Sequence, residues 1–434
     1  MDYVAGLLDY IEKSPTAFHA AAEAAAVLER KGFTRLQENS IWQIVPGGRY
    51  YVTRNLSALI AFAVPESGFG AYQIAAAHGD SPTFKLKPVA EEKTAAAYTR
   101  LNVEKYGGMI YATWMDRPLS IAGRAFIRTG DTFETRLVDL GRDAVLIPNM
   151  PIHFCHEIND GYKFNPQTDL LPLYGEAGAA DTLNGEIAAC CGVRTEDIAG
   201  SDLYLYNRTP GTVWGAENAF FSSGRIDDLE CAWTALTAFV DAECENHINV
   251  LAILDNEEVG SGSKQGADST FLRDVLIRCG TALGAADEEI RSAIASGFMV
   301  SADNAHAVHP NHPEKFDTTN RVYMNKGIVI KQNASQRYTT DGVSSAVFAA
   351  VCEKAGVNVQ YFANRSDIPG GSTLGNIANS HVSMNTVDIG LAQLAMHSAY
   401  ETAGTKDPEM MIQALKTYWE TEILMTGDGR FTLM

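Results

Sequence analysis

Residues 251–261 read Leu251-Ala252-Ile253-Leu254-Asp255-Asn256-Glu257-Glu258-Val259-Gly260-Ser261. The apolar half of this segment indicates a buried β-strand, which stops in two adjacent carboxylates and a glycine turn. In an open α/β sheet, ligand crevices form at the carboxyl ends of the strands, so the glutamates stand where a site is expected. Side chains alternate faces along an extended chain, which predicts different roles for Glu257 and Glu258 and leaves open which has which. The alternative to a functional site is that these acidic residues form a solvent-exposed turn after an ordinary core strand.

Helix-like and strand-like segments alternate on both sides of this run. Near the amino terminus, two helix-like runs are separated at Ser14-Pro15-Thr16, where Ser14 is expected to cap the second helix. Strands of this kind, alternating with helices, predict an α/β fold in which helices cover both faces of a sheet. The expected strands are 50–53, 59–64, 72–77, 249–255, 297–301 and 357–362, and the expected later helices are 229–242, 269–279, 344–355 and 410–425.

The middle of the chain has a different pattern of predicted secondary structure. A chain of 434 residues exceeds the usual size of a single core, which favours two structural units. Short β-type runs such as 125–131 and 144–148 are separated by turn residues, and long amphipathic helices are scarce there. We therefore expect an inserted, mainly β domain at 89–210, within a discontinuous α/β domain formed by 1–88 and 211–434.

Composition restricts the class of partner. The sequence has 34 basic and 53 acidic residues, a formal net charge of -19, and no Lys/Arg-rich run. Nucleic acid and anionic membranes are therefore poor partners. The first residues lack a signal-peptide pattern, and no segment approaches about eighteen uninterrupted apolar residues. Seven cysteines without a C-x-x-C pair favour reduced thiols. We expect a cytoplasmic protein.

Several polar residues directly follow apolar runs or lie in tight Gly/Ser-rich turns. Two imidazoles and at least three carboxylates suit Zn²⁺, Mn²⁺ or Co²⁺ better than Mg²⁺ or Ca²⁺, which prefer oxygen ligands. Two histidines are enough to give one ligand to each of two ions, and a bridging carboxylate would hold the ions ~3.5–4 Å apart. These residues are His78, Asp80, Asp227, Glu257, Glu258, Asp303 and His397.

A hydrolytic site of this kind also needs a base that is not a metal ligand. The paired glutamates meet this need, because one can bind metal while its neighbour takes a proton from water. Asp80, two residues after His78, is expected to accept a hydrogen bond from the His78 ring. The alternatives are an N-cap role for Asp303 and an Asx turn at Asp227. A further tract, His306, His309 and His312, has no apolar helical face around it.

Motifs spread over almost the whole chain carry a specific resemblance. The sequence resembles the aspartyl aminopeptidase and vacuolar aminopeptidase I family of binuclear zinc exopeptidases. Each motif alone is weak, but their number and order are specific. They are Ser14-Pro15-Thr16-Ala17-Phe18-His19, His78-Gly79-Asp80-Ser81-Pro82, Trp114-Met115-Asp116-Arg117-Pro118-Leu119, Asn165-Pro166-Gln167-Thr168-Asp169, residues 254–261, Ser301-Ala302-Asp303-Asn304-Ala305-His306, Ser335-Gln336-Arg337-Tyr338, Val387-Asp388-Ile389-Gly390 and Gln393-Leu394-Ala395-Met396-His397-Ser398.

The resemblance implies a zinc-exopeptidase-type mixed sheet and a role for each site residue. It implies two Zn²⁺ per subunit, with Mn²⁺ or Co²⁺ as substitutes. His78 and Asp303 would bind one ion, Glu258 and His397 the other, and Asp227 both. Glu257 would be the general base and Asp80 the partner of His78.

The resemblance also implies how subunits and substrates meet. The inserted domain would be a dimerisation domain, and His153 would enter the active site of a neighbouring subunit. Lys331 matches the lysine associated with the acidic side chain of the substrate. The family assembles from dimers into a tetrahedral dodecamer. We therefore expect a homo-oligomeric aminopeptidase that removes N-terminal Asp or Glu from peptides.

Three departures from the family pattern leave alternatives open. Gly79 follows His78 where the family usually has threonine, and Asp228 follows Asp227 where the family often has asparagine. Residues 368–371, beside the expected substrate pocket, differ from the family's usual sequence. None removes a ligand, so they bear on side-chain preference. The alternatives are an aminopeptidase for neutral or apolar N-termini and a non-catalytic shell or cargo protein. A retained Glu257 disfavours the second, because a structural metal site needs no free base.

Overall fold

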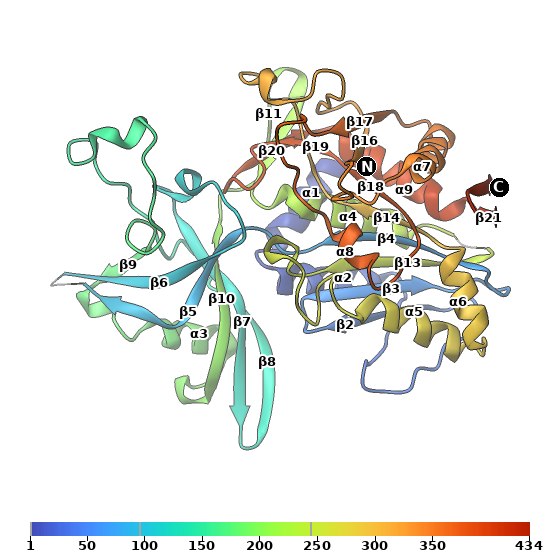
Figure 1. Cartoon of the computed structure of the whole chain (residues 1–434). Coiled ribbons are helices and arrows are strands. Elements are labelled where there is room, and N and C mark those ends of the chain that lie inside the picture. The colour runs from blue at the N-terminus through green and yellow to red at the C-terminus, as the bar shows by residue number, and fades with distance from the viewer. Residues whose placement is uncertain (1, 95–96, 244) are drawn as a thin grey trace.

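The structure is a computed structural model that describes residues 2–94, 97–243 and 245–434. Figure 1 shows two lobes, a large one that contains both chain ends and a smaller one formed by the middle of the chain. The large lobe is built on a nine-stranded sheet, and the smaller lobe on a separate six-stranded sheet.

The nine-stranded sheet is mixed, with the order β1-β2-β3-β13-β4-β14-β18-β16-β17. Its centre, from β13 to β18, is parallel, because β13 and β14 flank β4 and β18 follows β14 in the same direction. The strand predicted at 249–255 corresponds to β13. The strands are β1 (Thr34–Arg35), β2 (Arg49–Arg54), β3 (Ala58–Ala63), β4 (Ala71–His78), β13 (His247–Leu254), β14 (Phe298–Ala302), β16 (Ile328–Gln332), β17 (Val359–Ala363) and β18 (Asn385–Gly390).

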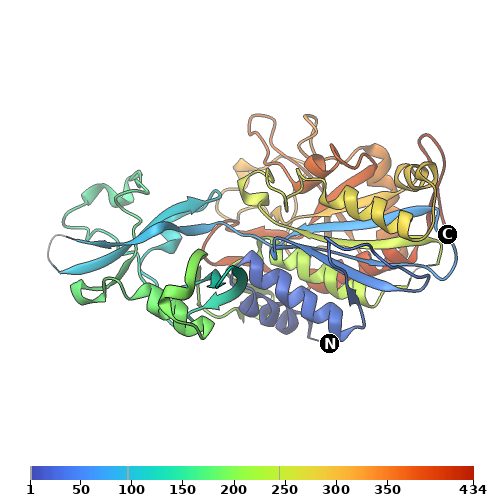
Figure 2. The same ribbon diagram turned by 90° about the horizontal axis from the view of Figure 1, so that it is seen from below.

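Helices cover both faces of this sheet. Because side chains alternate along β13, Leu251 and Ile253 pack into one core, and Val250 and Ala252 pack into the other. Figure 2 shows α1 and α2 on the face opposite the α5 and α6 layer. The fold prediction is confirmed. One core contains α1 (Tyr3–Lys13), α2 (Ala17–Arg30), α4 (Ile226–Val240), α7 (Gly342–Ala355) and α9 (Asp407–Glu420); the other contains α5 (Phe271–Ala282), α6 (Asp287–Ala295) and α8 (Leu374–Ala378).

Two local predictions are wrong. Ser14 does not cap the second helix: it is the C-cap of α1, and Thr16 stands at the N-cap of α2. The predicted helix 410–425 ends at Glu420, because Thr421 is extended and the chain turns into the hairpin β21 (Ile423–Gly427) and β22 (Arg430–Leu433). Strands β16 and β18 are not among the strands predicted from the sequence.

The smaller lobe is an antiparallel sheet with the order β8-β7-β10-β5-β6-β9. Its strands come from residues 83–207, compared with the predicted segment 89–210. Buried apolar side chains that include Trp114 and Leu203 form its own core. The elements are β5 (Thr83–Lys93), β6 (Tyr98–Tyr106), β7 (Leu119–Thr129), β8 (Thr132–Asp139), β9 (Leu173–Glu176), β10 (Ile198–Asn207) and α3 (Leu183–Cys191).

A five-stranded sheet lies beside the large sheet, with the order β11-β12-β20-β19-β15. Its strands are β11 (Thr212–Trp214), β12 (Phe220–Ser223), β15 (Ala305–His306), β19 (Ala392–Leu394) and β20 (Glu401–Gly404). The loop between β19 and β20 contains His397.

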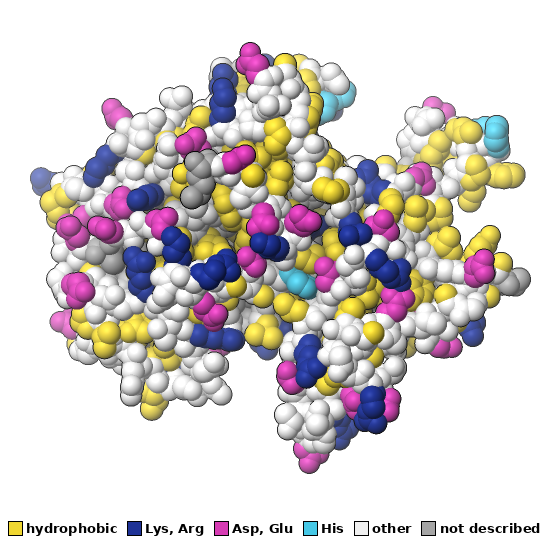
Figure 3. All heavy atoms as spheres, turned by 180° about the vertical axis from the view of Figure 1, so that it is seen from behind, with side chains coloured by type: hydrophobic (Ala, Val, Ile, Leu, Met, Phe, Trp, Pro, Cys, Tyr) yellow, Lys and Arg dark blue, Asp and Glu magenta, His cyan; other side chains and the backbone are white. Residues whose placement is uncertain are grey.

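Acidic and basic side chains are mixed over the molecular surface that Figure 3 shows. Over the described residues, every helix is too short or too polar to cross a membrane.

Candidate metal centre

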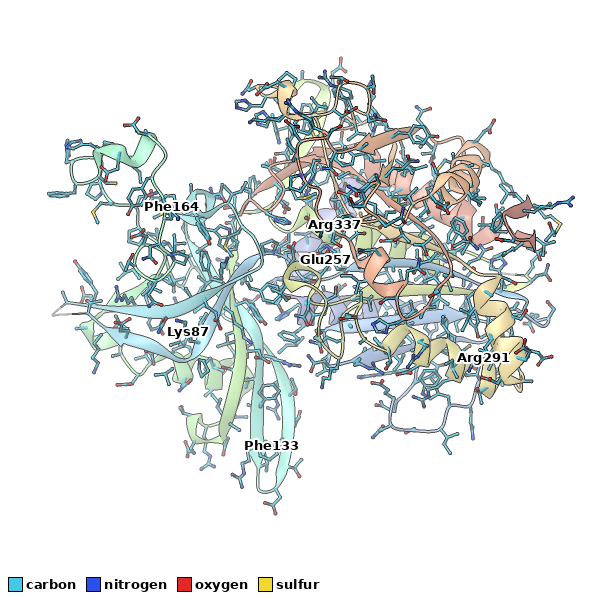
Figure 4. The ribbon with its side chains drawn as sticks, in the orientation of Figure 1. Lys87, Phe133, Phe164, Glu257, Arg291 and Arg337 are labelled. Carbon is cyan, nitrogen blue, oxygen red and sulfur yellow. The ribbon has the colours of Figure 1, made fainter. Side chains whose placement is uncertain are left out.

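Three neighbouring strands deliver polar side chains to one edge of the large sheet. β4 ends at His78, β13 is followed by Glu257 and Glu258, and β14 is followed by Asp303. Because β13, β4 and β14 are adjacent and parallel, their carboxyl ends meet at the same edge. Figure 4 shows Glu257 on the side of the large lobe that faces the inserted lobe.

Two further residues reach this edge from other elements. Asp227 lies at the start of α4, and His397 lies in the β19–β20 loop. The Asp227 carboxylate is only 3% exposed. Its Oδ1 lies 3.5 Å from His78 Nε2, and its Oδ2 lies 3.2 Å from His397 Nε2. One buried carboxylate therefore faces two imidazoles.

The ligand atoms form two groups that share Asp227. Within each group, the candidate ligand atoms lie within 4.8 Å of one another. His397 Nε2 also lies 3.4 Å from Glu258 Oε2. The first group is His78, Asp227, Asp228 and Asp303, and the second is Asp227, Glu258 and His397.

Unpartnered oxygens at the centre show that these residues fit a metal. Asp227 Oδ1, Asp228 Oδ1 and Glu258 Oε1 are buried and have no hydrogen-bond partner among the described residues. Buried carboxylate oxygens without partners are costly, and cations are the usual compensation. Imidazoles with carboxylates are a zinc donor set.

Burial among these carboxylates raises the pKa of both glutamates. Burial raises the pKa of Glu257 to about 8, and the carboxylates of Asp303 and Asp80 add to that effect against an opposing effect of His78. Burial raises the pKa of Glu258 well above its usual value, and Asp227 adds to it. Burial would also raise the pKa of Asp227, but the neighbouring rings of His397 and His78 hold that pKa below the usual range.

The alternation expected for Glu257 and Glu258 does not apply. The strand ends at Leu254, and residues Glu257–Val259 form a 3₁₀ turn in place of an extended chain. Both glutamates therefore lie within reach of His78 in one further cluster of possible ligand atoms.

Asp80 holds this turn. Its Oδ1 accepts from the Glu257 backbone N–H at 3.1 Å, and its Oδ2 accepts from that of Glu258 at 3.2 Å. Its Oδ1 lies 3.4 Å from His78 Nδ1, whereas its own backbone oxygen lies 3.1 Å from that nitrogen. Support of His78 therefore comes from the backbone and the side chain of Asp80 together.

Glu401 is a buried carboxylate that the sequence does not single out. Its Oε2 accepts from the Asp227 backbone N–H at 3.1 Å, and its Oε1 accepts from that of His397 at 2.7 Å. Burial raises the pKa of Glu401 to about 8, with the Asp227 carboxylate adding to the effect. Glu401 follows no apolar run, so the only available signal was its position four residues after His397.

Asp228 is a second possible ligand that the sequence analysis did not predict, because only its neighbour Asp227 was taken as a ligand.

Lys331 and His153 lie outside the ligand groups. Lys331 is 2% exposed, and its Nζ donates to the Asn304 backbone oxygen at 3.1 Å and lies 3.3 Å from Asp303 Oδ1. Burial acts to lower the pKa of Lys331, but the charge of Asp303 outweighs it and the pKa is raised. His153 is exposed in the inserted lobe, between β8 and a short turn at His156–Asn159.

The tract His306, His309 and His312 is not part of either ligand group. His306 and His309 line an adjacent cavity together with Lys315, Arg365 and Met396. The lining of this cavity includes Met396, which directly precedes His397 of the second ligand group.

A mixed α/β sheet with a buried His/carboxylate cluster at its carboxyl edge defines a class of metal-dependent hydrolases. The family model of aminopeptidase I zinc metalloprotease (M18) matches residues 10–419. The chain belongs to this M18 peptidase family and is a zinc metallo-aminopeptidase, a hydrolase of peptide bonds.

Relatives and solved structures agree with this assignment. A probable M18 family aminopeptidase 2 of Clostridium acetobutylicum is 44% identical over 416 residues, which cover 94% of this chain and 96% of that protein. The chain in the cryo-EM structure of the Ape4 and Nbr1 complex is 34% identical with a TM-score of 0.92, over 96% of this chain and 85% of that chain. The S. cerevisiae mApe1 dodecamer is 27% identical with a TM-score of 0.85, over 96% of each chain.

Glu401→Gln tests the bond from one carboxylate to two ligand segments. An amide has one acceptor oxygen, so in either orientation its NH₂ group faces the N–H of Asp227 or of His397. We expect metal affinity to fall roughly 10–100-fold, the range for residues that orient ligands. Zinc affinity measured by chelator competition checks this, with the exposed Glu12→Gln as control. Affinities equal in both variants would contradict it.

Proposed function

We propose that this aminopeptidase removes N-terminal residues, by preference Asp or Glu, from peptides at a two-zinc centre. The observation that supports this most directly is the position of Asp227, whose two oxygens face His78 and His397. A carboxylate shared between two ligand groups is the bridging arrangement of two-metal hydrolases.

Five residues would hold the two ions. His78 and Asp303 would bind the first, Glu258 and His397 the second, and Asp227 both. When bound, Zn²⁺ supplies Lewis acidity that polarises a carbonyl and makes water nucleophilic at neutral pH; Mn²⁺ or Co²⁺ would supply the same chemistry. Asp228, within the first group, is an additional candidate ligand.

Glu257 is the proposed general base. Its carboxylate lies with His78 and Glu258 in a cluster that could itself bind an ion, but Glu257 belongs to neither of the two groups that contain the proposed bridge, Asp227. For this reason we assign it as the base and not as a ligand. Its carboxylate would take a proton from the attacking water and return it to the leaving amine. Asp80 would hold the Glu257 backbone in place through the 3.1 Å bond to its N–H.

Positive charge beside the centre supports a preference for acidic substrates. Lys331 pairs with Asp303, and Lys315 and Arg365 line the neighbouring cavity. In a protein of net charge -19, such local cations would offset the repulsion of an acidic substrate. The second candidate is a preference for neutral or apolar N-termini, favoured by Phe362 and Ile368 in the same cavity.

Assembly is the remaining part of the proposal. We infer a tetrahedral dodecamer built from dimers, supported by the dodecameric S. cerevisiae relative. His153 would act in a neighbouring subunit, since it is exposed between Ile152 and Phe154, which are 44% and 82% exposed. The six described cysteines are free thiols, which fits the reducing cytoplasm as the location.

Glu257→Gln separates the base from the ligands. The variant should retain zinc, because Glu257 is not a proposed ligand, while turnover falls by ~10²–10⁴-fold, the contribution of general-base catalysis. Elemental analysis and steady-state kinetics measure the two effects, with Glu258→Gln as the matched neighbour that should lose zinc. Zinc lost from Glu257→Gln and kept by Glu258→Gln would reverse the two roles.

Lys331→Leu tests substrate preference. Loss of a charge-assisted contact of ~1.5–3 kcal/mol should lower kcat/KM for Asp and Glu substrates roughly tenfold to more than a hundredfold and spare Leu substrates. Because Lys331 also pairs with Asp303, the zinc content of the variant is measured in parallel. Lys315→Leu is the comparison. If the ratio of kcat/KM for Asp substrates to that for Leu substrates changes only in Lys315→Leu, the selection of acidic substrates would belong to the cavity and not to Lys331.

His153→Ala should lower activity, although His153 lies outside both ligand groups, because the histidine would act across a subunit boundary. His156→Ala, an exposed histidine of the same segment, is the control. Chains carrying His153→Ala and chains carrying Glu257→Gln are then co-assembled, and mixing is verified by mass. Activity recovered in the mixture supports a shared site, whereas a verified mixture without recovery contradicts it.

A further inference from the structure

Residues 106–113 of the inserted lobe lie against the two loops that carry Glu258 and His397. This segment, here called the strap, reads Tyr106-Gly107-Gly108-Met109-Ile110-Tyr111-Ala112-Thr113 and begins at the last residue of β6. The other metal-centre residues described above come from the large lobe. The strap is therefore a direct connection between the inserted lobe and the centre of the same chain.

At its first residue, the strap is bonded to the glutamate turn. The Tyr106 hydroxyl donates to Asp80 Oδ2 at 2.7 Å and accepts from Asn256 Nδ2 at 2.8 Å. Asp80 in turn accepts from the backbone N–H groups of Glu257 and Glu258. One phenol hydroxyl therefore links the residue before the turn to the carboxylate that holds it.

Close packing follows at Gly107. Its φ is +78°, and a Cβ at this position would lie 3.2 Å from both the Cβ and the backbone oxygen of Glu258. A side chain here would be strained and would also press on Glu258.

The rest of the strap holds the loop that contains His397. The Ile110 N–H donates to the His397 backbone oxygen at 3.0 Å, and Thr113 Oγ1 accepts from the Ala399 N–H at 2.9 Å. The main chain of the loop that contains His397 is thus bonded to the strap at two points.

We propose that the strap positions the Glu257–Glu258 turn and His397, so that the inserted lobe completes the metal centre of its own chain. Tyr106 is then a positioning residue that acts through Asp80. The proposal rests on the proposed function, because it concerns the same ligands, and it gives the inserted lobe a role within one subunit in addition to assembly.

Tyr106→Phe removes only the hydroxyl. We expect zinc affinity to fall about 10–100-fold and kcat to fall with it, as for other residues that orient metal ligands. Tyr204→Phe is the control, because its ring packs against Tyr106 at 5.6 Å and its hydroxyl has no hydrogen bond within the described chain. Melting temperatures of both variants show whether the loss reflects general destabilisation.

A double-variant cycle tests the route through Asp80. If Tyr106 acts through Asp80, Tyr106→Phe should have little further effect on zinc affinity in an Asp80→Asn background. Gly107→Ala tests the second contact independently and should also weaken zinc binding. Gly130→Ala controls for strain, since Gly130 has φ +61° with no heavy atom within 4 Å of the added Cβ.

Chelator competition with Zn²⁺ alone, in the absence of peptide, separates the two proposals. Zinc binding by the unmodified protein tests the proposed centre, and the ratio of variant to unmodified affinity tests the strap. Unchanged affinity in both Tyr106→Phe and Gly107→Ala overturns the strap and leaves the proposed function standing. Additive effects of Tyr106→Phe and Asp80→Asn overturn the route through Asp80.

Discussion

The placement of one buried carboxylate constrains the rest of this site. Asp227 is 3% exposed and lies 3.5 Å from the ring nitrogen of His78 and 3.2 Å from that of His397. A carboxylate has two oxygens close together, so it can serve both sides only if α4, β4 and the β19–β20 loop meet within a few ångströms. Parallel strands bring His78 and Asp303 to that point, because adjacent strands of one direction end at the same edge.

Carboxylates that are not proposed ligands hold these segments in register. Glu401 accepts from the backbones of Asp227 and His397, and Asp80 accepts from those of Glu257 and Glu258. Glu401 joins two separate backbone segments through its two oxygens, whereas Asp80 binds two successive N–H groups of one turn. Such bonds are strong when they are buried and charge-assisted, and they limit the movement of the ligands they support. The negative charge gathered here is costly to bury, and bound cations would offset that cost.

The sequence predicts the strand ends well and their surroundings poorly. His78, Asp303 and the glutamates follow apolar runs, a signal that depends only on local periodicity. The alternation argument failed for Glu257 and Glu258, because the extended chain stops at Leu254 and a 3₁₀ turn follows. Glu401 contacts Asp227, and Tyr106 contacts Asn256, which lie 174 and 150 residues away along the chain, and no local pattern predicts such contacts. Lys331 was expected near substrate, and its burial against Asp303 depends on strand packing that the sequence does not reveal.

The central claim, that Asp227 is shared by two zinc ions, is tested most directly by a crystal structure of the zinc-loaded protein with diffraction data on both sides of the zinc absorption edge. We expect two anomalous peaks ~3.5–4 Å apart, one beside His78 and Asp303, the other beside Glu258 and His397, each in contact with one oxygen of Asp227. A single peak at full zinc occupancy, or two peaks of which one does not contact Asp227, would contradict the account.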